Sequence, residues 1–216
     1  MSDDEIGLFE AMFTQRAIRS FKPDPIPREV LEKIVFAATK APSGGNHQPW
    51  AFVVVQDKAA RATMAEYARE GFRWMYDNAV KRMQPGDALP FPRLKPMIEG
   101  FETIPAIIVV CGVSTPGQQA DATQLSGSIF PAVQNLLLAA RGLGVGAALT
   151  SGWAIPRMAD MKTLLGLPDH VMPLAFIPLG YPDKERYGPT TRRPLDEVMH
   201  WDTYSDGANT AVAAHR

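Results

Sequence analysis

Apolar residues recur with the 3.6-residue period of an α-helix in five stretches of the chain. The first predicts a helix over residues 3–15, which the capping-box pair Ser2 and Glu5 would begin. A second helix is expected between Pro27 and Pro42, because proline suits the first turn of a helix and interrupts one further along. The remaining helices are expected from Asp57 toward Arg73, over residues 125–141 and over residues 157–165.

Four uninterrupted apolar runs have the length and the β-branched content of buried strands. They span residues 51–55, 105–112, 145–149 and 172–180. Pro178 has no N–H to give to a neighbouring strand, so we expect it at a sheet edge or at a bulge. The glycines of residues 142–146 lie between a helix and a strand, the reverse of the order in a dinucleotide-binding turn. We interpret them as a helix end and a tight turn.

Residues 71–100 differ in pattern from the rest of the chain. They carry many bulky apolar side chains without a clean period, and a proline-rich stretch interrupts them. Such a segment is typical of a lid over a pocket or of a surface that meets a partner. A helix hairpin packed on the core explains the composition equally well, and the residues alone leave both interpretations open.

The 216 residues, of which 46% are hydrophobic and 21% are charged, indicate one globular domain. We assign the domain to residues 1–205, with the lid at about 71–100, and expect a disordered tail over residues 206–216. A net charge of −1 offers no basic surface for nucleic acid or for a membrane. A single cysteine, an acidic amino terminus and the lack of a membrane-length apolar run indicate a cytoplasmic protein.

The sequence argues against several common chemistries. None of the four histidines lies near another or near Cys111 at metal-ligand spacing, so we expect no metal site. The chain lacks both the serine elbow of hydrolases and the lysine loop of nucleotide hydrolases. Cys111 lies inside an apolar run and is expected to be a buried structural thiol rather than a nucleophile.

What remains is a set of arginines beside loops of small and polar residues. Arg16 and Arg19 lie near one end of the chain, and Arg192 and Arg193 lie near the other. Guanidinium groups bind phosphate through paired hydrogen bonds, so the two clusters could hold one phosphorylated ligand. The loop of residues 42–48 leads into a buried strand and suits close approach to a flat ligand. Solvated arginines and an ordinary helix-to-strand connection are the alternatives.

Four motifs, in the right order, resemble those of the FMN-dependent nitroreductase family, and the resemblance spans nearly the whole chain. Residues 15–19 stand where the family commonly has Arg-Arg-Ser-x-Arg, and residues 42–52 match Pro-Ser-x-x-Asn-x-Gln-Pro-Trp-x-Phe. Residues 134–144 match a family helix end, and residues 192–196 match a basic pair before Pro-Leu-Asp. The layout is shared with iodotyrosine-dehalogenase-like and flavin-destructase-like branches.

The resemblance implies an α+β fold, with a central mixed β-sheet sandwiched by helices, and a homodimer that exchanges carboxy-terminal segments. FMN would lie in the dimer interface. The residues implied in cofactor binding are Gln15, Arg16, Ala17, Arg19, Pro42, Ser43, Asn46, Gln48, Thr150, Ser151, Gly152, Arg192 and Arg193. The arginines would serve the phosphate and the pyrimidine edge. Gln15 and Ala17 replace an arginine and a serine of the family pattern, so we expect backbone contacts from them.

The remaining roles also follow from the resemblance. Ser43 and Asn46 would line the flavin, from the same or the opposite subunit. Ser151 and Gly152 would present N–H groups near N5 and O4 of the flavin, with Thr150 a weaker candidate. Arg19 would stabilise the reduced flavin, and no acid–base residue is identifiable.

The implied activity is hydride transfer from NAD(P)H through FMN to an electron-poor acceptor, such as a nitro compound or a quinone. Reductive dehalogenation or flavin cleavage on the same fold is one alternative. Dehalogenases clamp an amino acid with charged lid residues, and Glu66, Tyr67, Glu70 and Lys81 are the charges and phenol available here. A non-catalytic flavin-binding protein is the other alternative.

Overall fold

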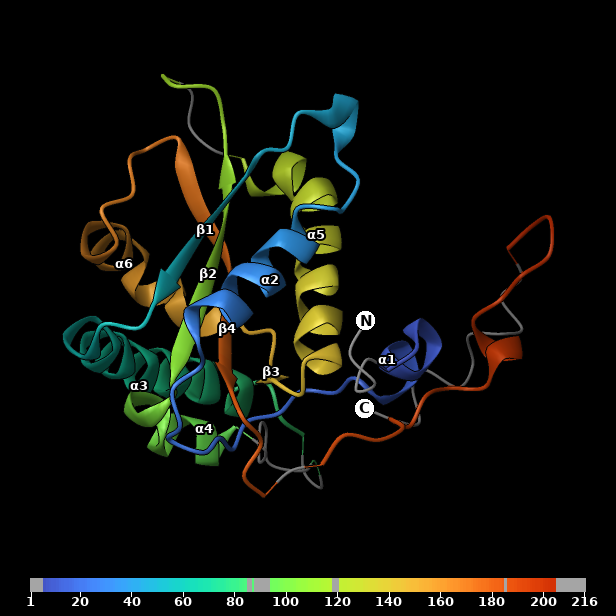
Figure 1. Cartoon of the computed structure of the whole chain (residues 1–216), viewed down its shortest axis with the longest axis horizontal. Coiled ribbons are helices and arrows are strands. Elements are labelled where there is room, and N and C mark those ends of the chain that lie inside the picture. Colours follow the sequence, from blue (N-terminus) through green and yellow to red (C-terminus); the bar gives the residue numbers. More distant parts are fainter. Residues whose placement is uncertain (1–5, 85–86, 88–93, 118–120, 185, 205–216) are drawn as a thin grey trace.

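The computed structural model describes residues 6–84, 87, 94–117, 121–184 and 186–204. Its centre is a sheet with the strand order β1-β2-β4-β3 (Figure 1). The strands are β1 (Trp50–Val55), β2 (Ala106–Val113), β3 (Gly146–Ala147) and β4 (Val171–Gly180). All neighbouring strands pair antiparallel, so the expectation of a mixed sheet is wrong for the described part of the chain. The resemblance supplied that expectation, and no pattern within this chain specifies strand direction.

Two prolines mark the irregular places of β4. The register between β2 and β4 shifts between Val110 and Cys111, whose partners are Ala175 and Pro173, so the bulge lies beside Pro173. Pro178 lies between two neighbouring strands, not at an edge or a bulge as expected. Its carbonyl accepts the N–H of Ala148 at 3.4 Å. In an antiparallel strand the N–H and C=O of one residue point toward the same neighbouring strand. The N–H that Pro178 lacks would therefore point toward β3, and regular pairing with β3 is only two residues long.

Two helices, α2 (Arg28–Ala38) and α5 (Ala122–Gly142), cover one face of the sheet (Figure 1). Ile34, Ile129 and Leu136 project from them into the core and are fully buried. The broad apolar stripe of α5 therefore packs on the sheet and on α2 at once.

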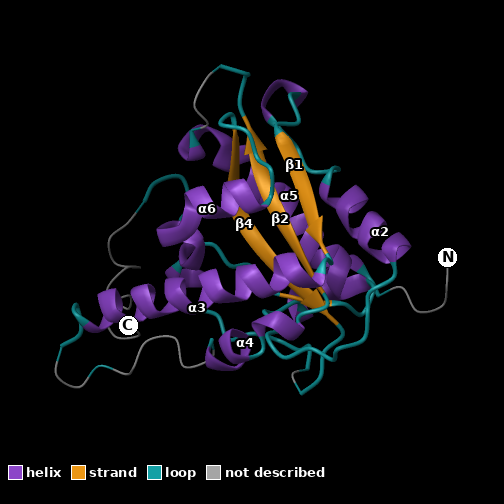
Figure 2. Cartoon of the chain, turned by 90° about the vertical axis from the view of Figure 1, so that its left-hand side faces the viewer, coloured by secondary structure: helices purple, strands orange, loops and turns teal. Residues whose placement is uncertain are grey.

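Three helices lie on the opposite face, namely α3 (Lys58–Val80), α4 (Lys95–Glu99) and α6 (Met158–Leu164) (Figure 2). Trp153 lies at the centre of this second core and is 1% exposed. Its ring centroid is 4.8 Å from that of Phe176 of β4 and 5.2 Å from that of Phe101. A sheet with helices on both faces confirms the α+β fold. Within the described residues, no helix combines the length and apolar composition needed to cross a membrane.

Several element boundaries differ from the expected ones. The helix α1 (Leu8–Thr14) begins later than residue 3, and the Ser2 and Glu5 cap lies outside the described residues. The helix α5 begins at Ala122 because the Asp121 carboxylate accepts the N–H of Thr123 at 2.7 Å. A 3₁₀ helix, Gly152–Arg157, precedes α6, which therefore starts one residue later than expected.

The expected lid, residues 71–100, contains the second half of α3 and the whole of α4. The helix α3 runs to Val80, although its pattern indicated an end near Arg73. Met97 of α4 is 1% exposed, so α4 packs on the core. Residues 85–86 and 88–93 of this segment, like the expected tail, lie outside the described residues. Lid motion stays a prediction.

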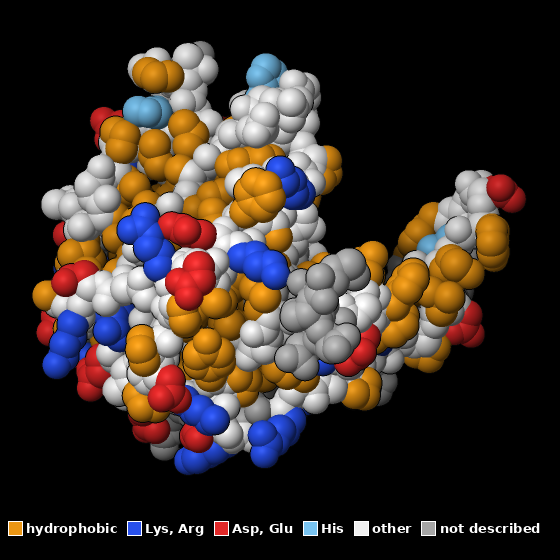
Figure 3. Space-filling view, viewed as in Figure 1, with side chains coloured by type: hydrophobic (Ala, Val, Ile, Leu, Met, Phe, Trp, Pro, Cys, Tyr) orange, Lys and Arg blue, Asp and Glu red, His pale blue; other side chains and the backbone are white. Residues whose placement is uncertain are grey.

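Residues 189–204, which we call the arm, leave the body of the molecule beyond α1 (Figure 1). The arm carries large exposed apolar side chains: Leu195 is 65% and Trp201 is 79% exposed. Phe9 and Phe13 of α1 are 69% and 68% exposed. Figure 3 shows apolar side chains covering much of the arm. Exposed apolar area on this scale is typical of a surface that meets a partner.

Candidate cofactor site

The candidate residues near the amino terminus belong to an extended stretch, residues 15–22, which we call the amino-terminal strip. It follows α1 and runs beside β3, where the N–H of Ile18 donates to the carbonyl of Ala147 at 3.1 Å. Ile18 is fully buried. Gly146 permits this approach, because a Cβ there would come within 2.7 Å of the Ile18 side chain. The strip is therefore fixed to the sheet by backbone pairing and by a buried anchor.

The polar candidates of the strip lie on either side of that anchor. Gln15, Arg16, Ala17 and Arg19 are all half-buried. Arg19 Nη1 donates to the carbonyl of Ala17 at 3.5 Å, and the N–H of Gln15 closes the last turn of α1. The strip thus presents two guanidinium groups from a defined backbone, which suits an anionic ligand.

The second group of candidates, Thr150 to Gly152, follows β3 and opens the 3₁₀ helix. The N–H and hydroxyl of Thr150 donate to the carbonyl of Phe176 at 3.0 and 2.7 Å, and Trp153 Nε1 donates to the same hydroxyl at 3.0 Å. The Thr150 hydroxyl is therefore engaged in holding the turn. Ser151 is exposed and Gly152 is half-buried. The first N–H groups of a helix have no acceptor within it, so they are available to a ligand.

The third group belongs to the loop of residues 42–48, whose backbone is unusual. Gly45, Asn46 and Gln48 have φ angles of 56°, 55° and 51°. Positive φ is uncommon for a residue with a side chain, above all for one as large as glutamine, and such strain concentrates at functional sites. The Ser43 hydroxyl supports the loop by accepting the N–H of Gln48 at 3.0 Å. Pro42, Asn46 and Gln48 are exposed.

A groove runs between this loop, the end of β2 and the start of α5, and Figure 3 shows the corresponding hollow at the top of the molecule. Its lining includes Gln48 and Trp50 from the loop side, Thr115 beyond β2, and Gln124 and Ser128 of α5. The loop is tied to α5 by the N–H of Gly44, which donates to Ser128 Oγ at 3.3 Å.

One chain does not bring the loop and the amino-terminal strip together. The loop contacts α5 at Ser128, whereas α1 contacts the same helix at Arg141, whose Nε donates to Thr14 Oγ1 at 2.9 Å. These two anchor points are thirteen residues apart, or about 20 Å at the helical rise. The strip pairs with Ala147 at one end of the sheet, and the loop precedes Trp50 at the other end. The Thr150 turn pairs with Phe176 in the middle of β4.

The root of the arm carries a contact that sequence reasoning missed. The Arg141 guanidinium lies 4.2 Å from the centroid of the Tyr187 ring and 3.5 Å from Glu10 Oε1. The N–H of Gly188 donates to the carbonyl of Thr14 at 3.2 Å. These contacts join residues 46 or more positions apart, so no local pattern could have revealed them. They start the arm directly beside the amino-terminal strip.

Arg192 and Arg193 lie on the arm and are both exposed. Arg192 Nη1 donates to the carbonyl of the adjacent Thr191 at 2.9 Å. The structure therefore places this pair on a projecting segment, unlike the half-buried arginines of the strip.

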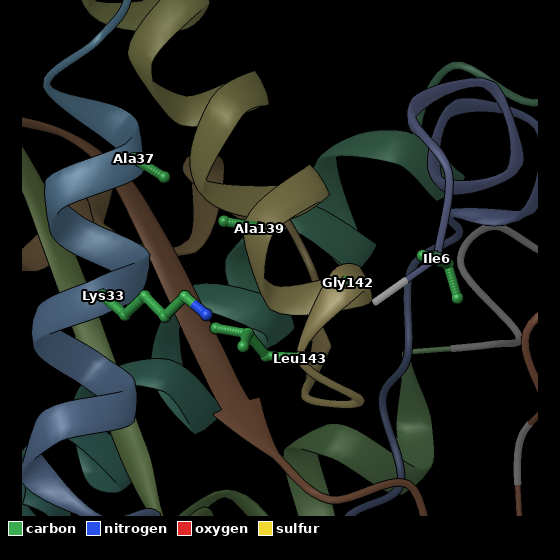
Figure 4. A pocket seen from close by; sticks show the side chains of 6 residues that line it. All are labelled: Ile6, Lys33, Ala37, Ala139, Gly142 and Leu143. Atoms are coloured by element: carbon green, nitrogen blue, oxygen red, sulfur yellow. The ribbon is translucent and has the colours of Figure 1, made fainter. Parts of the chain in front are cut away.

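Two other features have no part in the candidate site. A pocket between α2 and the end of α5 is lined by Ile6, Lys33, Ala37, Ala139, Gly142 and Leu143, and none of these is an expected cofactor residue (Figure 4). Cys111 is fully buried, as expected, and burial raises the pKa of its thiol to about 12. Among the described residues, no three metal-ligating side chains gather.

Comparison with known proteins identifies the chain. Residues 13–181 match the model of the nitroreductase family. The chain belongs to the nitroreductase family. The family resemblance read from the four motifs is therefore confirmed, as is the expectation of an oxidoreductase of this family.

Its relatives carry two kinds of name. The NADH dehydrogenase of Thermus thermophilus is 29% identical over 203 residues, covering 88% of this chain and 94% of that protein. The iodotyrosine deiodinase of Nematostella vectensis is 30% identical over 207 residues, covering 92% of this chain and 76% of that protein.

Solved structures agree on the fold. One from Parabacteroides distasonis, bearing the name NADH dehydrogenase/NAD(P)H nitroreductase, is 30% identical with a TM-score of 0.66 and covers 93% of this chain and 100% of that one. An iodotyrosine deiodinase bound to FMN and 3-iodo-L-tyrosine has a TM-score of 0.72 at 22% identity, covering 92% and 100% of the two chains.

Proposed function

We propose that this protein is an FMN-dependent oxidoreductase that transfers hydride from NAD(P)H to an electron-poor acceptor, such as a nitro compound or a quinone. The observation that carries the proposal is the amino-terminal strip beside the Thr150 turn. The strip with Arg16 and Arg19 pairs with Ala147, and the Thr150 turn and its 3₁₀ helix follow Ala147 directly along the sequence, in a member of the nitroreductase family. Relatives named NAD(P)H nitroreductase support the same reading.

The donor set of this chain fits FMN. Arg16 would neutralise the phosphate dianion, assisted by Arg192 or Arg193, since guanidinium pairs bind phosphate through two hydrogen bonds. Arg19 would lie at the pyrimidine edge. The N–H groups of Ser151 and Gly152 would bind the polar edge of the ring, whereas the Thr150 hydroxyl keeps its role in holding the turn.

FMN, when bound, supplies the hydride chemistry. The residues of the chain bind it, orient it and stabilise charge. Arg19 would stabilise the negative charge that reduction places on the ring, because a fixed cation in a half-buried position is only partly screened. No described side chain near the strip is assigned as a proton donor, so the acceptor would take its protons from water.

We also propose that the protein is a homodimer and that each site is built from two chains. The support is the distance between the strip and the loop of residues 42–48, about 20 Å along α5, and the exposed apolar side chains of α1 and the arm. A second copy would bring its Ser43 to Gln48 loop to the flavin.

The arm would cover the second copy. Among the described strands β1 is at one edge of the sheet, and beside it lies a groove with Phe36 63% exposed and Val54 41% exposed. An open strand edge and an apolar groove together suit an extended segment, and the arm is an extended segment with exposed Leu195 and Trp201. The exchange of carboxy-terminal segments is therefore retained as a proposal.

Reductive dehalogenation is the second candidate, because deiodinases are among the relatives at about the same identity as the NADH dehydrogenases. The residues named for a charged clamp are only partly available. Glu70 is bound by both Nε and Nη2 of Arg157, and the Arg157 guanidinium also lies over the Tyr67 ring. Glu66 and Lys81 are exposed. Of these residues, Glu66 and Lys81 are therefore open to such a clamp, whereas Glu70 is engaged by Arg157.

The experiment is to release the chromophore from purified protein and then to follow NADH and NADPH oxidation with three acceptors: a nitroarene, a quinone and a halotyrosine. Release of FMN with turnover of the first two supports the proposal. Turnover of the halotyrosine alone supports the dehalogenase. Bound flavin that no nicotinamide reduces would indicate a flavin-binding protein without this activity.

A further inference from the structure

Arg157, the last residue of the 3₁₀ helix, joins three elements. Its Nε and Nη2 donate to the two carboxylate oxygens of Glu70 on α3 at 2.7 and 3.1 Å, and its Nη1 donates to Asp160 Oδ2 on α6 at 2.9 Å. The guanidinium lies 5.4 Å from the centroid of the Tyr67 ring. A two-pronged pair of this kind fixes orientation as well as distance. The hydrogen bond from Arg157 lowers the pKa of Glu70, so the pair stays ionised.

Directly beside this pair, α3 and the 3₁₀ helix touch through their backbones. A Cβ on Gly71 would lie 1.7 Å from the carbonyl oxygen of Trp153. A Cβ on Gly152 would lie 3.4 Å from Met75 Sδ of α3. The other side of the turn is held to β4 through the Thr150 hydroxyl. Residues 151–152 are therefore held between α3 on one side and β4 on the other.

We propose that Glu70 and Arg157 are positioning residues of the cofactor site. The pair holds α3 against the 3₁₀ helix and so keeps the Ser151 and Gly152 N–H groups at the place where they meet the flavin ring. Neither side chain needs to touch the cofactor. This inference rests on the proposed function, because it assigns those N–H groups to FMN.

The chain supplies a matched control on the same helix. Arg69, next to Glu70, pairs with Glu102, which lies in the 3₁₀ helix Phe101–Thr103 and not in the candidate site. The side chains of the two pairs are similarly exposed, 42% and 51% for Arg69 and Glu102, and 39% and 51% for Arg157 and Glu70. Because Arg157 also donates to Asp160, the variant matched to Arg69→Gln is Glu70→Gln, which removes only the pair with Arg157. An effect of Glu70→Gln that Arg69→Gln lacks cannot be a general loosening of α3.

The test compares Glu70→Gln, Arg157→Gln and Arg157→Lys with Arg69→Gln. In flavin-free protein, amide hydrogen exchange of residues 151–154 is expected to quicken about two- to fivefold in the first two variants, the range of one exposed ion pair, and not in Arg69→Gln. Arg157→Lys keeps the positive charge but loses the paired hydrogen bonds to Glu70, so its exchange rate should lie between those of the wild type and of Arg157→Gln. In FMN-loaded protein we expect the shift of the flavin midpoint potential from the wild-type value to rank the variants in the same order as their exchange rates.

Equal exchange rates and an unchanged potential in all variants, with normal FMN binding, would overturn this inference and leave the proposed function standing. A wild-type protein that binds no FMN would overturn the proposed function, and this inference with it. Thermal unfolding of each variant shows whether it is folded. We expect a similar fall in midpoint temperature in Glu70→Gln and Arg69→Gln, with faster exchange of residues 151–154 only in Glu70→Gln.

Discussion

At the residue scale, the arginines of this chain differ in how firmly they are held. Arg16 and Arg19 flank buried Ile18 on a strip paired to β3, whereas Arg192 and Arg193 are exposed on the arm. A fixed cation in a half-buried place acts more strongly on a nearby charge than a mobile exposed one does. We therefore expect Arg19, at the pyrimidine edge, to influence reactivity, and the exposed pair to influence retention of the cofactor.

The corresponding prediction compares Arg19→Ala with Arg192→Ala. Both should weaken FMN binding, since loss of a charge-assisted hydrogen bond costs about 1.5–3 kcal/mol, or roughly tenfold to a hundredfold in affinity. At saturating FMN, Arg192→Ala should recover its rate of flavin reduction, and Arg19→Ala should not. Stopped-flow reduction and the midpoint potential measure this. Equal rates, or an unchanged potential in Arg19→Ala, would mean that Arg19 does not lie at the pyrimidine edge.

A second prediction concerns Tyr187. Burial raises the pKa of its phenol to about 12, while the ordinary value is near 10. Between these values the unfolded chain loses the proton and the folded one keeps it, so the free energy of unfolding falls as pH rises from 10 to 12. Tyr187→Phe removes this dependence. The free energy of unfolding can fall by at most about 1.4 kcal/mol per pH unit from this group. We expect a smaller fall, because the ring is partly exposed to solvent.

Urea unfolding of both proteins at pH 9 and at pH 11.5 measures the effect. At pH 9, Tyr187→Phe should be at least as stable as the wild type, because the hydroxyl is buried and finds no hydrogen-bond partner among the described residues. The contact between the Arg141 guanidinium and the aromatic ring at position 187 does not involve the hydroxyl, so Tyr187→Phe retains it. An identical fall in stability with pH in both proteins would contradict this account.

At the element scale, periodicity was sufficient for most of the sheet and for the helices that pack on it. The continuous apolar runs became β1, β2 and β4. β2 and most of β4 are buried as expected, whereas the edge strand β1 is fully buried only at Val55. The third run was expected over residues 145–149, but β3 is two residues long. Its length depends on Pro178 of β4, a residue far along the chain, so no local pattern specified it.

The helix α3 shows the same limit. Its apolar positions lose their period near Arg73, yet it continues to Val80, because its second half packs on Trp153 and the 3₁₀ helix. Gly71 lies within the helix expected from the sequence, at the crossing with the 3₁₀ helix. Only the contact with the Trp153 carbonyl explains why glycine stands there.

Gly71→Ala gives the third prediction. Helix propensity alone predicts a gain of about 0.5–1 kcal/mol in the free energy of unfolding. The added Cβ would lie 1.7 Å from Trp153 O, so the two elements must move apart, and overpacking typically costs about 1–3 kcal/mol. We expect a net loss. The two effects have opposite signs, so denaturant unfolding decides between them, and a stabilised variant would show that α3 is not held at this crossing.

At the scale of the whole molecule, the motifs specified which residues belong together but not which chain each comes from. The strip, the Thr150 turn and the loop of residues 42–48 were all expected at one cofactor. In the structure the strip lies at the Ala147 end of the sheet, the Thr150 turn lies at the middle of β4, and the loop lies at the other end. The motifs could not predict this separation of the strip from the loop, because it depends on the two segments contacting α5 at points thirteen residues apart.

The last prediction tests whether two chains build one site. Arg19→Ala impairs the strip in every subunit, and Asn46→Gly impairs the loop while glycine keeps the positive φ found there. In a homodimer of either variant, both sites contain a defect. In a heterodimer, the strip of the Asn46→Gly chain meets the loop of the Arg19→Ala chain, and that site is intact.

Random exchange of equal amounts makes half of the dimers mixed, so about a quarter of all sites should regain wild-type activity. We expect the mixture, after joint unfolding and refolding with FMN, to exceed the sum of the two variants treated separately. If strip and loop served one cofactor within a single chain, no arrangement of subunits would unite an intact strip with an intact loop, and the mixture would show only the average of its parts. Gain of activity on mixing therefore depends on the shared site, and light scattering of the same samples reports whether the dimer forms.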